Sequence, residues 1–276
     1  MLFDSHTHLN NDTITPEERE ALIADIEASD LSYVMDVGFD LASSMQAVND
    51  AQANSWCYAA VGVHPHDTDD MDEDILTLIK GLAAKDKVMA IGEIGLDYHY
   101  DFSERENQKK WFRRQIQLAN ELKLPIIIHS READEDTMTI LKEEGAFSKE
   151  RQSWFPPRKG PDGEMLPDSR VLIHCFSSSR EIARQYVKLG ATIGICGPVT
   201  YKNNRRGKEV VTEIPLEFLT VETDAPYLTP EPFRGRKNKA PYVEHTARKV
   251  AELKEMEYEK VAEITCENAK RFFSIP

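Results

Sequence analysis

The chain has 276 residues, 41% of them hydrophobic and 30% charged, and its formal net charge at pH 7 is −14. That length is ordinary for one large α/β barrel or for two small domains, and no apolar stretch approaches the roughly 18–20 residues of a membrane span. Proteins that bind nucleic acid nonspecifically are usually basic, so the acidic balance argues against such a binder, although an enzyme needs positive charge only at its site.

Short apolar runs alternate with segments of helical period along the chain. The expected strands are residues 2–6, 33–38, 58–64, 88–95, 125–130, 170–175, 191–196 and 218–224. The expected helices are residues 16–29, 41–54, 72–84, 104–123, 133–144, 179–189, 207–213, 241–254 and 258–273. This alternation implies βαβ units and a parallel sheet. Eight strands in about this length predict a single-domain (β/α)8 TIM barrel, with a doubly wound open sheet as the alternative.

One segment, residues 148–169, interrupts the alternation. It has four prolines, two glycines and no helical period. Long irregular connections are uncommon inside a domain. Because this one precedes the sixth strand, we expect a surface insertion at the face of the barrel opposite the usual active-site rim.

The cysteines give no sign of a disulfide framework or of a zinc ribbon. No two of the four form a CxxC pair, and three lie in apolar or strand-like runs. No basic region followed by an apolar region marks a signal peptide at the N-terminus. We therefore expect reduced thiols in a cytoplasmic protein, with no membrane partner.

Residues that bind metals cluster at the C-terminal ends of the predicted strands. Seven of the eight histidines lie at such an end or just beyond it, and only His245 lies in a predicted helix. The metal-competent residues at these ends are His6, His8, His64, His66, Glu93, His129, His174 and Asp224. In a TIM barrel this rim is where several strands each contribute one group to an active site.

The first two histidines lie one residue apart in "DSHTHL" (4–9). Side chains alternate between the two faces of a strand, so His6 and His8 point the same way. A pair of neutral imidazoles aimed at one point is half of a zinc-type coordination shell. A lone histidine at a strand end is more often structural, but several strand ends adding His or carboxylate favour a metal site.

Six motifs together resemble the TatD family of metal-dependent deoxyribonucleases and hydrolases. They are "DSHTHL" (4–9), "GVHPHD" (62–67), "AIGEIGLDYHY" (90–100), "PIIIHSREA" (125–133), "LIHCFSSS" (172–179) and "VETDAPYLTPEPFRGRKN" (221–238). The resemblance covers nearly the whole chain and implies a TIM-barrel hydrolase with two divalent metal ions.

The resemblance also implies a role for each candidate residue. His6, His8 and Asp224 would bind one ion together with Glu93, which would bridge to a second ion bound by His129 and His174. Asp224 and Glu93 would be catalytic, since Asp224 would orient the attacking water and take its proton. His64 and His66 would contact or position the substrate. The donor set fits Zn²⁺ or Mn²⁺ better than Mg²⁺.

Basic loops follow the seventh and eighth predicted strands, where barrels often bind phosphate. The candidate substrate-binding cations are Lys202, Arg205, Arg234 and Arg236, with Arg131 after the fifth strand. The ordinary reading of such charge runs is a solvated loop, and Arg131 could instead pair with Asp134 or Glu135. Tyr98, Tyr100 and Phe102 could stack on a nucleobase or pack beneath the rim.

These features favour a metal-dependent phosphodiesterase, a TatD-type deoxyribonuclease acting 3′–5′ on DNA ends or single strands with a water activated by two metal ions. The alternative is an amidohydrolase-like enzyme acting on a small ester, a lactone or an aminoacyl ester. A nonenzymatic binding protein with the same fold is a third possibility, which the complete set of acids and imidazoles disfavours.

Overall fold

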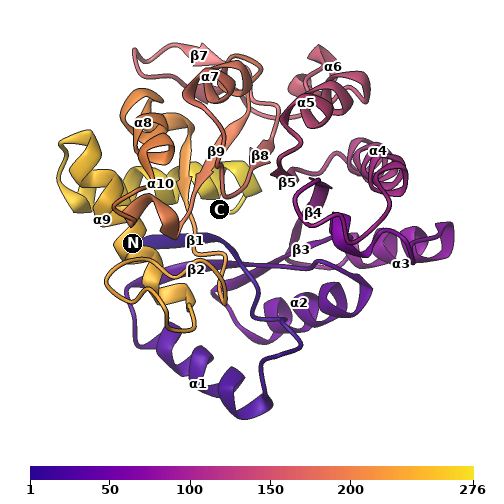
Figure 1. The fold of residues 1–276 in the computed structure, drawn as a ribbon, viewed down its shortest axis with the longest axis horizontal. Helices are drawn as coiled ribbons and strands as arrows, with labels where there is room; N and C mark the ends of the chain where they lie inside the picture. Colours follow the sequence, from indigo (N-terminus) through magenta and orange to yellow (C-terminus); the bar gives the residue numbers. More distant parts are fainter.

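A computed structural model describes residues 1–276, and its eight parallel strands form a nearly closed barrel with helices around it (Figure 1). The barrel strands are β1 (Leu2–Thr7), β2 (Leu31–Val37), β3 (Cys57–Val61), β4 (Val88–Asp97), β5 (Ile126–Arg131), β8 (Val171–Ile173), β9 (Thr192–Ile195) and β10 (Leu219–Val221). They neighbour one another in chain order. The predicted TIM barrel is therefore confirmed, because a doubly wound sheet would reverse its strand order.

Every predicted helix is present. The helices are α1 (Pro16–Glu27), α2 (Leu41–Ala53), α3 (Glu73–Ala83), α4 (Arg105–Leu122), α5 (Asp134–Glu143), α6 (Lys149–Ser153), α7 (Arg180–Lys188), α8 (Arg205–Glu213), α9 (Val243–Lys254) and α10 (Tyr258–Phe273). Short 3-10 helices occur at η1 (Pro65–Asp67), η2 (Gly197–Thr200), η3 (Leu216–Phe218) and η4 (Ala240–Tyr242). None of the helices is both long and apolar enough to cross a membrane.

Side-chain caps determine where two of the outer helices begin. Thr15 accepts a hydrogen bond from the backbone N–H of Glu18, and the Glu18 carboxylate accepts one from the backbone N–H of Thr15. Asp40 and Ser43 form the same reciprocal arrangement at the start of α2. These caps satisfy backbone donors that a helix leaves free at its N-terminus.

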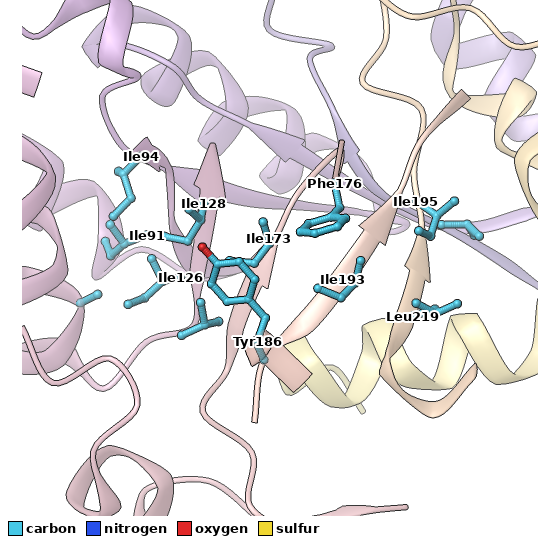
Figure 2. Packing of buried hydrophobic residues seen from close by; sticks show 14 of the residues in the cluster. Ile91, Ile94, Ile126, Ile128, Ile173, Phe176, Tyr186, Ile193, Ile195 and Leu219 are labelled. Carbon is cyan, nitrogen blue, oxygen red and sulfur yellow. The ribbon is translucent and has the colours of Figure 1, made fainter. Parts of the chain in front are cut away.

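Buried apolar side chains form two clusters on the two faces of the barrel strands. The larger, of 54 residues, includes Ile126 and Ile128 of β5, and Figure 2 shows these side chains beside those of neighbouring strands. The smaller, of 12 residues, includes Ile127 of β5, Leu172 of β8, and Phe272 of α10. Because side chains alternate along a strand, the smaller cluster lies on the same inner face as the histidines two residues further on.

The chain ends meet where the barrel closes. The backbone N–H of His8 donates to the carbonyl of Ala225 at 2.8 Å, and that of Asp224 donates to the carbonyl of His6 at 2.9 Å. The buried carboxylate of Asp4 accepts hydrogen bonds from the backbone N–H and the hydroxyl of Thr223. These bonds join β1 to the segment that follows β10.

The segment 148–169 is more regular than its sequence indicates. The prediction of no regular structure there is wrong, since the segment contains α6 and a small antiparallel hairpin of β6 (Arg158–Lys159) and β7 (Met165–Leu166). Long-range contacts hold it, because Arg151 donates to the carbonyls of Leu124 and Ser169. Those carbonyls precede β5 and β8, so the segment lies at the N-terminal ends of the strands.

Buried arginines attach this segment to the barrel. Asp168 is fully buried and pairs with Arg158 at 2.9 Å, with Arg170 at 3.0 Å, and with Arg271. Arg170 also donates to the carbonyl of Phe272 at the end of α10. The Asp168 carboxylate therefore compensates the positive charge of several buried guanidinium groups. Its removal would leave those charges buried without a partner, which is strongly destabilising.

We expect Asp168→Asn to lower the free energy of unfolding by about 3–5 kcal/mol, the range for a buried ion pair that loses one partner. Chemical denaturation followed by circular dichroism would measure it. Asp162→Asn changes an exposed carboxylate in the same hairpin and should leave stability unchanged. Equal midpoints for the two variants would contradict a stabilising role for Asp168.

Candidate metal centre

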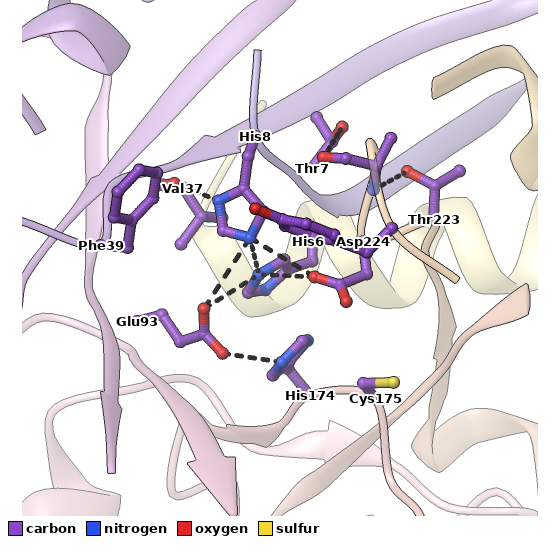
Figure 3. Close-up of polar contacts among 12 residues, drawn as sticks. His6, Thr7, His8, Val37, Phe39, Glu93, His174, Cys175, Thr223 and Asp224 are labelled. Carbon is purple, nitrogen blue, oxygen red and sulfur yellow. Dashed lines mark hydrogen bonds and ion pairs between the residues drawn. The ribbon is translucent and has the colours of Figure 1, made fainter. Parts of the chain in front are cut away.

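The imidazoles of His6, in β1, and of His8, just after it, converge with two carboxylates at the mouth of the barrel (Figure 3). His6 Nε2 lies 3.3 Å from His8 Nε2, 3.5 Å from Glu93 Oε2 and 3.7 Å from Asp224 Oδ1. His8 Nε2 lies 3.4 Å from the same Asp224 oxygen and 3.9 Å from the same Glu93 oxygen. The four residues that the sequence assigns to one ion therefore meet around one point.

The other oxygen of Glu93 faces a second set of imidazoles. Glu93 Oε1 lies 2.8 Å from His174 Nε2, 2.9 Å from His129 Nδ1 and 3.9 Å from His64 Nε2. One donor atom each of His64, Glu93 and His129 lie within 4.8 Å of one another, as do those of His6, His8 and Glu93. Glu93 thus lies between two groups of potential ligands. His64, which was expected to contact the substrate, lies in the second group and is close enough to Glu93 and His129 to be a ligand itself.

The spacing of the first group fits a shared cation. Ligand atoms about 2.0–2.1 Å from a tetrahedral Zn²⁺ are separated by about 3.3 Å, close to the separations around His6 and longer than most hydrogen bonds. His8 Nδ1 lies 2.7 Å from the carbonyl of Val37, which places a proton on Nδ1 and directs Nε2 toward the cluster. An ion that displaces the Nε2 proton would therefore find this nitrogen and two carboxylates around it.

A glycine allows the two central strands to bring Glu93 and His129 together. Gly95 lies opposite His129 in the register of β4 and β5 and has a positive φ of 153°. A Cβ atom at this position would overlap the carbonyl oxygen of His129. Any side chain at Gly95 would therefore push β5 away from the carboxylate of Glu93.

The two site carboxylates are ionised at neutral pH. Burial by itself raises the pKa of Glu93, but His174, His64, His6 and a hydrogen bond from His129 outweigh it, and the pKa lies well below the usual value. Burial also raises the pKa of Asp224, and the hydrogen bond from His8 with the nearby imidazoles lowers it overall. Both carboxylates are thus available to a cation.

The histidines divide into two electrostatic classes. Burial lowers the pKa of His6 and of His64, and neighbouring imidazoles lower it further. Burial also opposes the charged forms of His8, His129 and His174, but the carboxylates beside them outweigh it and raise the pKa of each ring. These environments favour the neutral form of the first class and the protonated form of the second, beside the carboxylates that stabilise it.

Asp97 contacts the site although the sequence analysis did not select it. This buried carboxylate lies 3.0 Å from His129 Nε2 and 3.0 Å from His66 Nε2 through the same oxygen, Oδ2. It fixes a proton on His129 Nε2 and leaves Nδ1 free to face Glu93. Asp97 is four residues after Glu93 in the same strand. Because an even spacing puts two side chains on the same face of a strand, the sequence did contain an indication that Asp97 points toward the site.

Glu222 is a second residue that the sequence analysis missed. It is fully buried, lies 3.2 Å from His174 Nδ1, and accepts a hydrogen bond from the backbone N–H of Cys175. Its contact fixes the ring orientation that directs His174 Nε2 to Glu93. Glu222 precedes Asp224 by two residues, so the alternation of side chains again indicates that the two carboxylates point the same way.

Two predicted substrate contacts lie beside the cluster. His66 is partly exposed and is held by Asp97. Arg131 makes no ion pair with Asp134 or Glu135, and its guanidinium instead lies 4.7 Å from the centre of the Tyr100 ring. Both side chains therefore face the rim on the side of β4 and β5.

Two other predicted cations, Lys202 and Arg205, line a hollow beside α7 and α8. An open hollow of about 570 Å³ is lined by Arg180, Lys202, Arg205, Lys208, Glu209, Thr212 and Glu213. Arg205 pairs with Glu209 at 2.7 Å, whereas Lys202 makes no ion pair. Lys202 thus lines a polar hollow without forming an ion pair of its own, although Glu209 and Glu213 also line it.

The loops after β9 and β10 contact each other. The Tyr201 hydroxyl donates to the carbonyl of Thr229 at 2.8 Å, and the Arg234 guanidinium lies 4.3 Å from the centre of the Tyr201 ring. Arg236 lies 5.6 Å from the Phe233 ring centre. Neither arginine makes an ion pair, so these loops keep positive charge available to a ligand.

The four cysteines are all free. Cys57, Cys196 and Cys266 are buried, and Cys175 is half-buried beside His174.

Comparison with known proteins gives a consistent family. A family model described as TatD related DNase matches residues 3–274. The chain is 46% identical over 275 residues to the uncharacterized metal-dependent hydrolase YabD of Bacillus subtilis, with 100% of each chain covered. It is 32% identical over 282 residues to the 3′-5′ ssDNA/RNA exonuclease TatD of Pectobacterium parmentieri, covering 99% of this chain and 100% of that protein.

A solved structure agrees with these matches. The crystal structure of YJJV, a TatD homolog from Escherichia coli K12, superposes with a TM-score of 0.85 at 25% sequence identity. The match covers 100% of this chain and 98% of the other. Fold and sequence therefore point to the same family along the whole chain.

We expect metal binding to release protons and to strengthen as the pH rises. The neighbouring carboxylates raise the pKa of His8, His129 and His174, so each ring keeps its proton to a higher pH than a free imidazole and loses it as the pH rises through its raised pKa. An ion must displace those protons to reach the nitrogen lone pairs. Calorimetric titration with Zn²⁺ in buffers of different ionisation enthalpy would measure the release. Heats that do not depend on the buffer would show that the rings are already neutral.

We expect Asp97→Asn to lower the affinity for the ion that His129 would bind by about 10–100-fold while the fold is retained. This is the usual effect of removing a group that orients a metal ligand. The affinity would be measured by competition with a chromophoric chelator. Asp86→Asn, at an exposed carboxylate without partners, is the matched control. Unchanged affinity at every site would show that Asp97 does not position His129.

Proposed function

The chain belongs to the TatD related DNase family of metal-dependent hydrolases, and on this basis we propose that the bond it hydrolyses is a phosphodiester of single-stranded DNA or of a DNA end. We further propose that it acts in the 3′–5′ direction and in the cytoplasm. The relative from Pectobacterium parmentieri that bears the name of a 3′-5′ ssDNA/RNA exonuclease supports this substrate class.

The observation that carries the proposal is the position of Glu93. One oxygen of this buried carboxylate faces His6 and His8, and the other faces His129 and His174. A carboxylate shared in this way is the arrangement expected of a bridging ligand in a two-metal hydrolase. We assign His6, His8, Glu93 and Asp224 to one ion, and Glu93, His129 and His174 to the other, with His64 close enough to join the second.

The ions, when bound, would stabilise charge on the phosphoryl oxygens and lower the pKa of water toward neutrality. Asp224 Oδ1 faces His6 and His8, while Oδ2 has no partner within the protein. Its lowered pKa keeps this carboxylate ionised at pH 7. We infer that Oδ2 accepts a hydrogen bond from the attacking water, orients it and then holds its proton.

The cationic rim supports a polyanionic substrate. Lys202, Arg234 and Arg236 carry positive charge without an ion-pair partner, in a protein whose net charge is −14. Guanidinium groups match the geometry of phosphate oxygens. A neutral ester or lactone gains nothing from these charges, which is why the amidohydrolase-like alternative is the weaker one.

The donor set favours zinc-like or manganese-like ions. Imidazole nitrogens make up most of the proposed ligands, whereas Mg²⁺ prefers oxygen ligands and retained water. We therefore propose Zn²⁺ or Mn²⁺ as the working ions, with Mg²⁺ as the weaker candidate.

The test is hydrolysis of end-labelled single-stranded oligonucleotides with Zn²⁺, Mn²⁺ or Mg²⁺ supplied. We expect nucleotides to be released from the 3′ end, and we expect Glu93→Gln to lower kcat/KM at least about a thousandfold, because both ions lose a shared ligand. Glu20→Gln, an exposed change in α1, is the control. Cleavage of esters or lactones with every oligonucleotide left intact would refute the phosphodiesterase and support the alternative.

A further inference from the structure

The exposed aromatic side chains of this protein are confined to one region. Tyr100, Phe102 and Tyr227 are 47%, 67% and 55% exposed, and the other large hydrophobic side chains that are at least this accessible are aliphatic. Tyr100 and Phe102 follow β4, the strand of Glu93, and Tyr227 follows Asp224. All of the molecule's exposed aromatic rings therefore lie at the mouth of the barrel.

Two of these rings form a stacked pair. Tyr100 and Phe102 have ring centroids 5.2 Å apart and an interplanar angle of 22°. Arg131 lies over Tyr100, as described above, and has no carboxylate partner. We call Tyr100, Phe102 and Arg131 the aromatic platform.

The aromatic platform is connected to the candidate metal centre. The His66 ring lies 4.8 Å from Phe102 and 5.6 Å from Tyr100, between centroids. His66 is held by Asp97, the same carboxylate that contacts His129. A group seated on the platform would therefore lie beside the residues proposed to act on a phosphodiester.

Tyr98, the third aromatic residue of this loop, has a different role. Its hydroxyl donates to Asp136 at 2.6 Å, and Arg105 lies 4.2 Å from its ring centre. Tyr98 is half-buried and its polar end is satisfied, so it packs beneath the rim. Among the aromatic residues of this loop, Tyr100 and Phe102 are therefore the two whose exposure no contact within the protein accounts for.

We propose that the aromatic platform binds an unpaired nucleobase of the nucleotide adjacent to the scissile phosphate, an inference that rests on the proposed function. Bases stack on accessible aromatic rings with little sequence preference, and the Arg131 guanidinium can contact a neighbouring phosphate. A base inside a duplex already has both faces covered by its neighbours and must leave the stack first. The platform therefore selects single-stranded ends over duplex DNA.

The test compares Phe102→Ala and Tyr100→Ala with the wild-type enzyme, loaded with metal, on two single-stranded oligonucleotides. One is fully based, and the other has abasic sites at its last residues. We expect each variant to lower kcat/KM on the based substrate by about 10–100-fold, mainly through KM, and to leave cleavage of the abasic substrate unchanged. Phe102→Trp should restore activity, because it restores a stacking surface. Met165→Ala, at a 62% exposed side chain in the hairpin of residues 158–166, is the matched control.

A binding measurement separates this inference from the proposed function. Quenching of a terminal 2-aminopurine reports stacking when a chelator prevents turnover. If the wild type cleaves no oligonucleotide but Phe102→Ala abolishes the quenching, the proposed function fails and the platform stands. If the wild type cleaves oligonucleotides and the platform variants act equally on both substrates, the platform is refuted and the proposed function stands.

Discussion

Hydrogen bonds between the two ends of the chain are the constraint on which the site depends. The backbone of His6 and His8 exchanges bonds with Asp224 and Ala225, so the residues that close the barrel are also the residues whose side chains meet. The imidazoles come from the start of the sequence and the carboxylate from more than two hundred residues later. Without that closure the two ends would lose both their backbone partners and their shared position, so folding of the barrel and assembly of the first group of ligands are one event.

The second constraint is charge. Glu93 is 4% exposed on its side chain, and a carboxylate at this depth is costly unless positive charge surrounds it. Imidazolium protons can provide that charge in the metal-free protein, and divalent ions can replace them at the same nitrogen atoms. Asp97 and Glu222 extend the arrangement outward, because each contacts the ring nitrogen opposite the one that faces Glu93. Asp97 and Glu222 thus fix which nitrogen of His129 and of His174 faces Glu93.

Much of the fold and of the candidate site could be predicted from the sequence, because both follow from local periodicity. Alternating apolar runs gave the strands, and a histidine at the end of a strand lies at the rim of any parallel barrel. Asp97 and Glu222 obeyed the same two-residue rule and lie within two of the quoted motifs, but their roles depend on contacts with histidines of other strands, which the sequence does not show. The hairpin of residues 158–166 could not be predicted, because Arg158 is held by Asp168 and by the distant carbonyl of Gly190. Ion pairing of loop cations is equally nonlocal, as the Lys237–Glu18 pair illustrates.

Pairing also explains how an acidic protein can attract a polyanion at one place. Lys237 and Lys239 are neutralised by acids of α1, at 3.2 Å and 2.6 Å, whereas Arg234 and Arg236 of the same loop are left unpaired. Exposed charges more than about 8–10 Å apart are largely screened at physiological salt, so the local balance outweighs the net charge of −14 for a bound phosphate. The remaining acidic surface repels a strand that approaches elsewhere. Uncompensated positive charge is thereby concentrated in the loops that follow β9 and β10, where the proposed function requires a phosphate to bind.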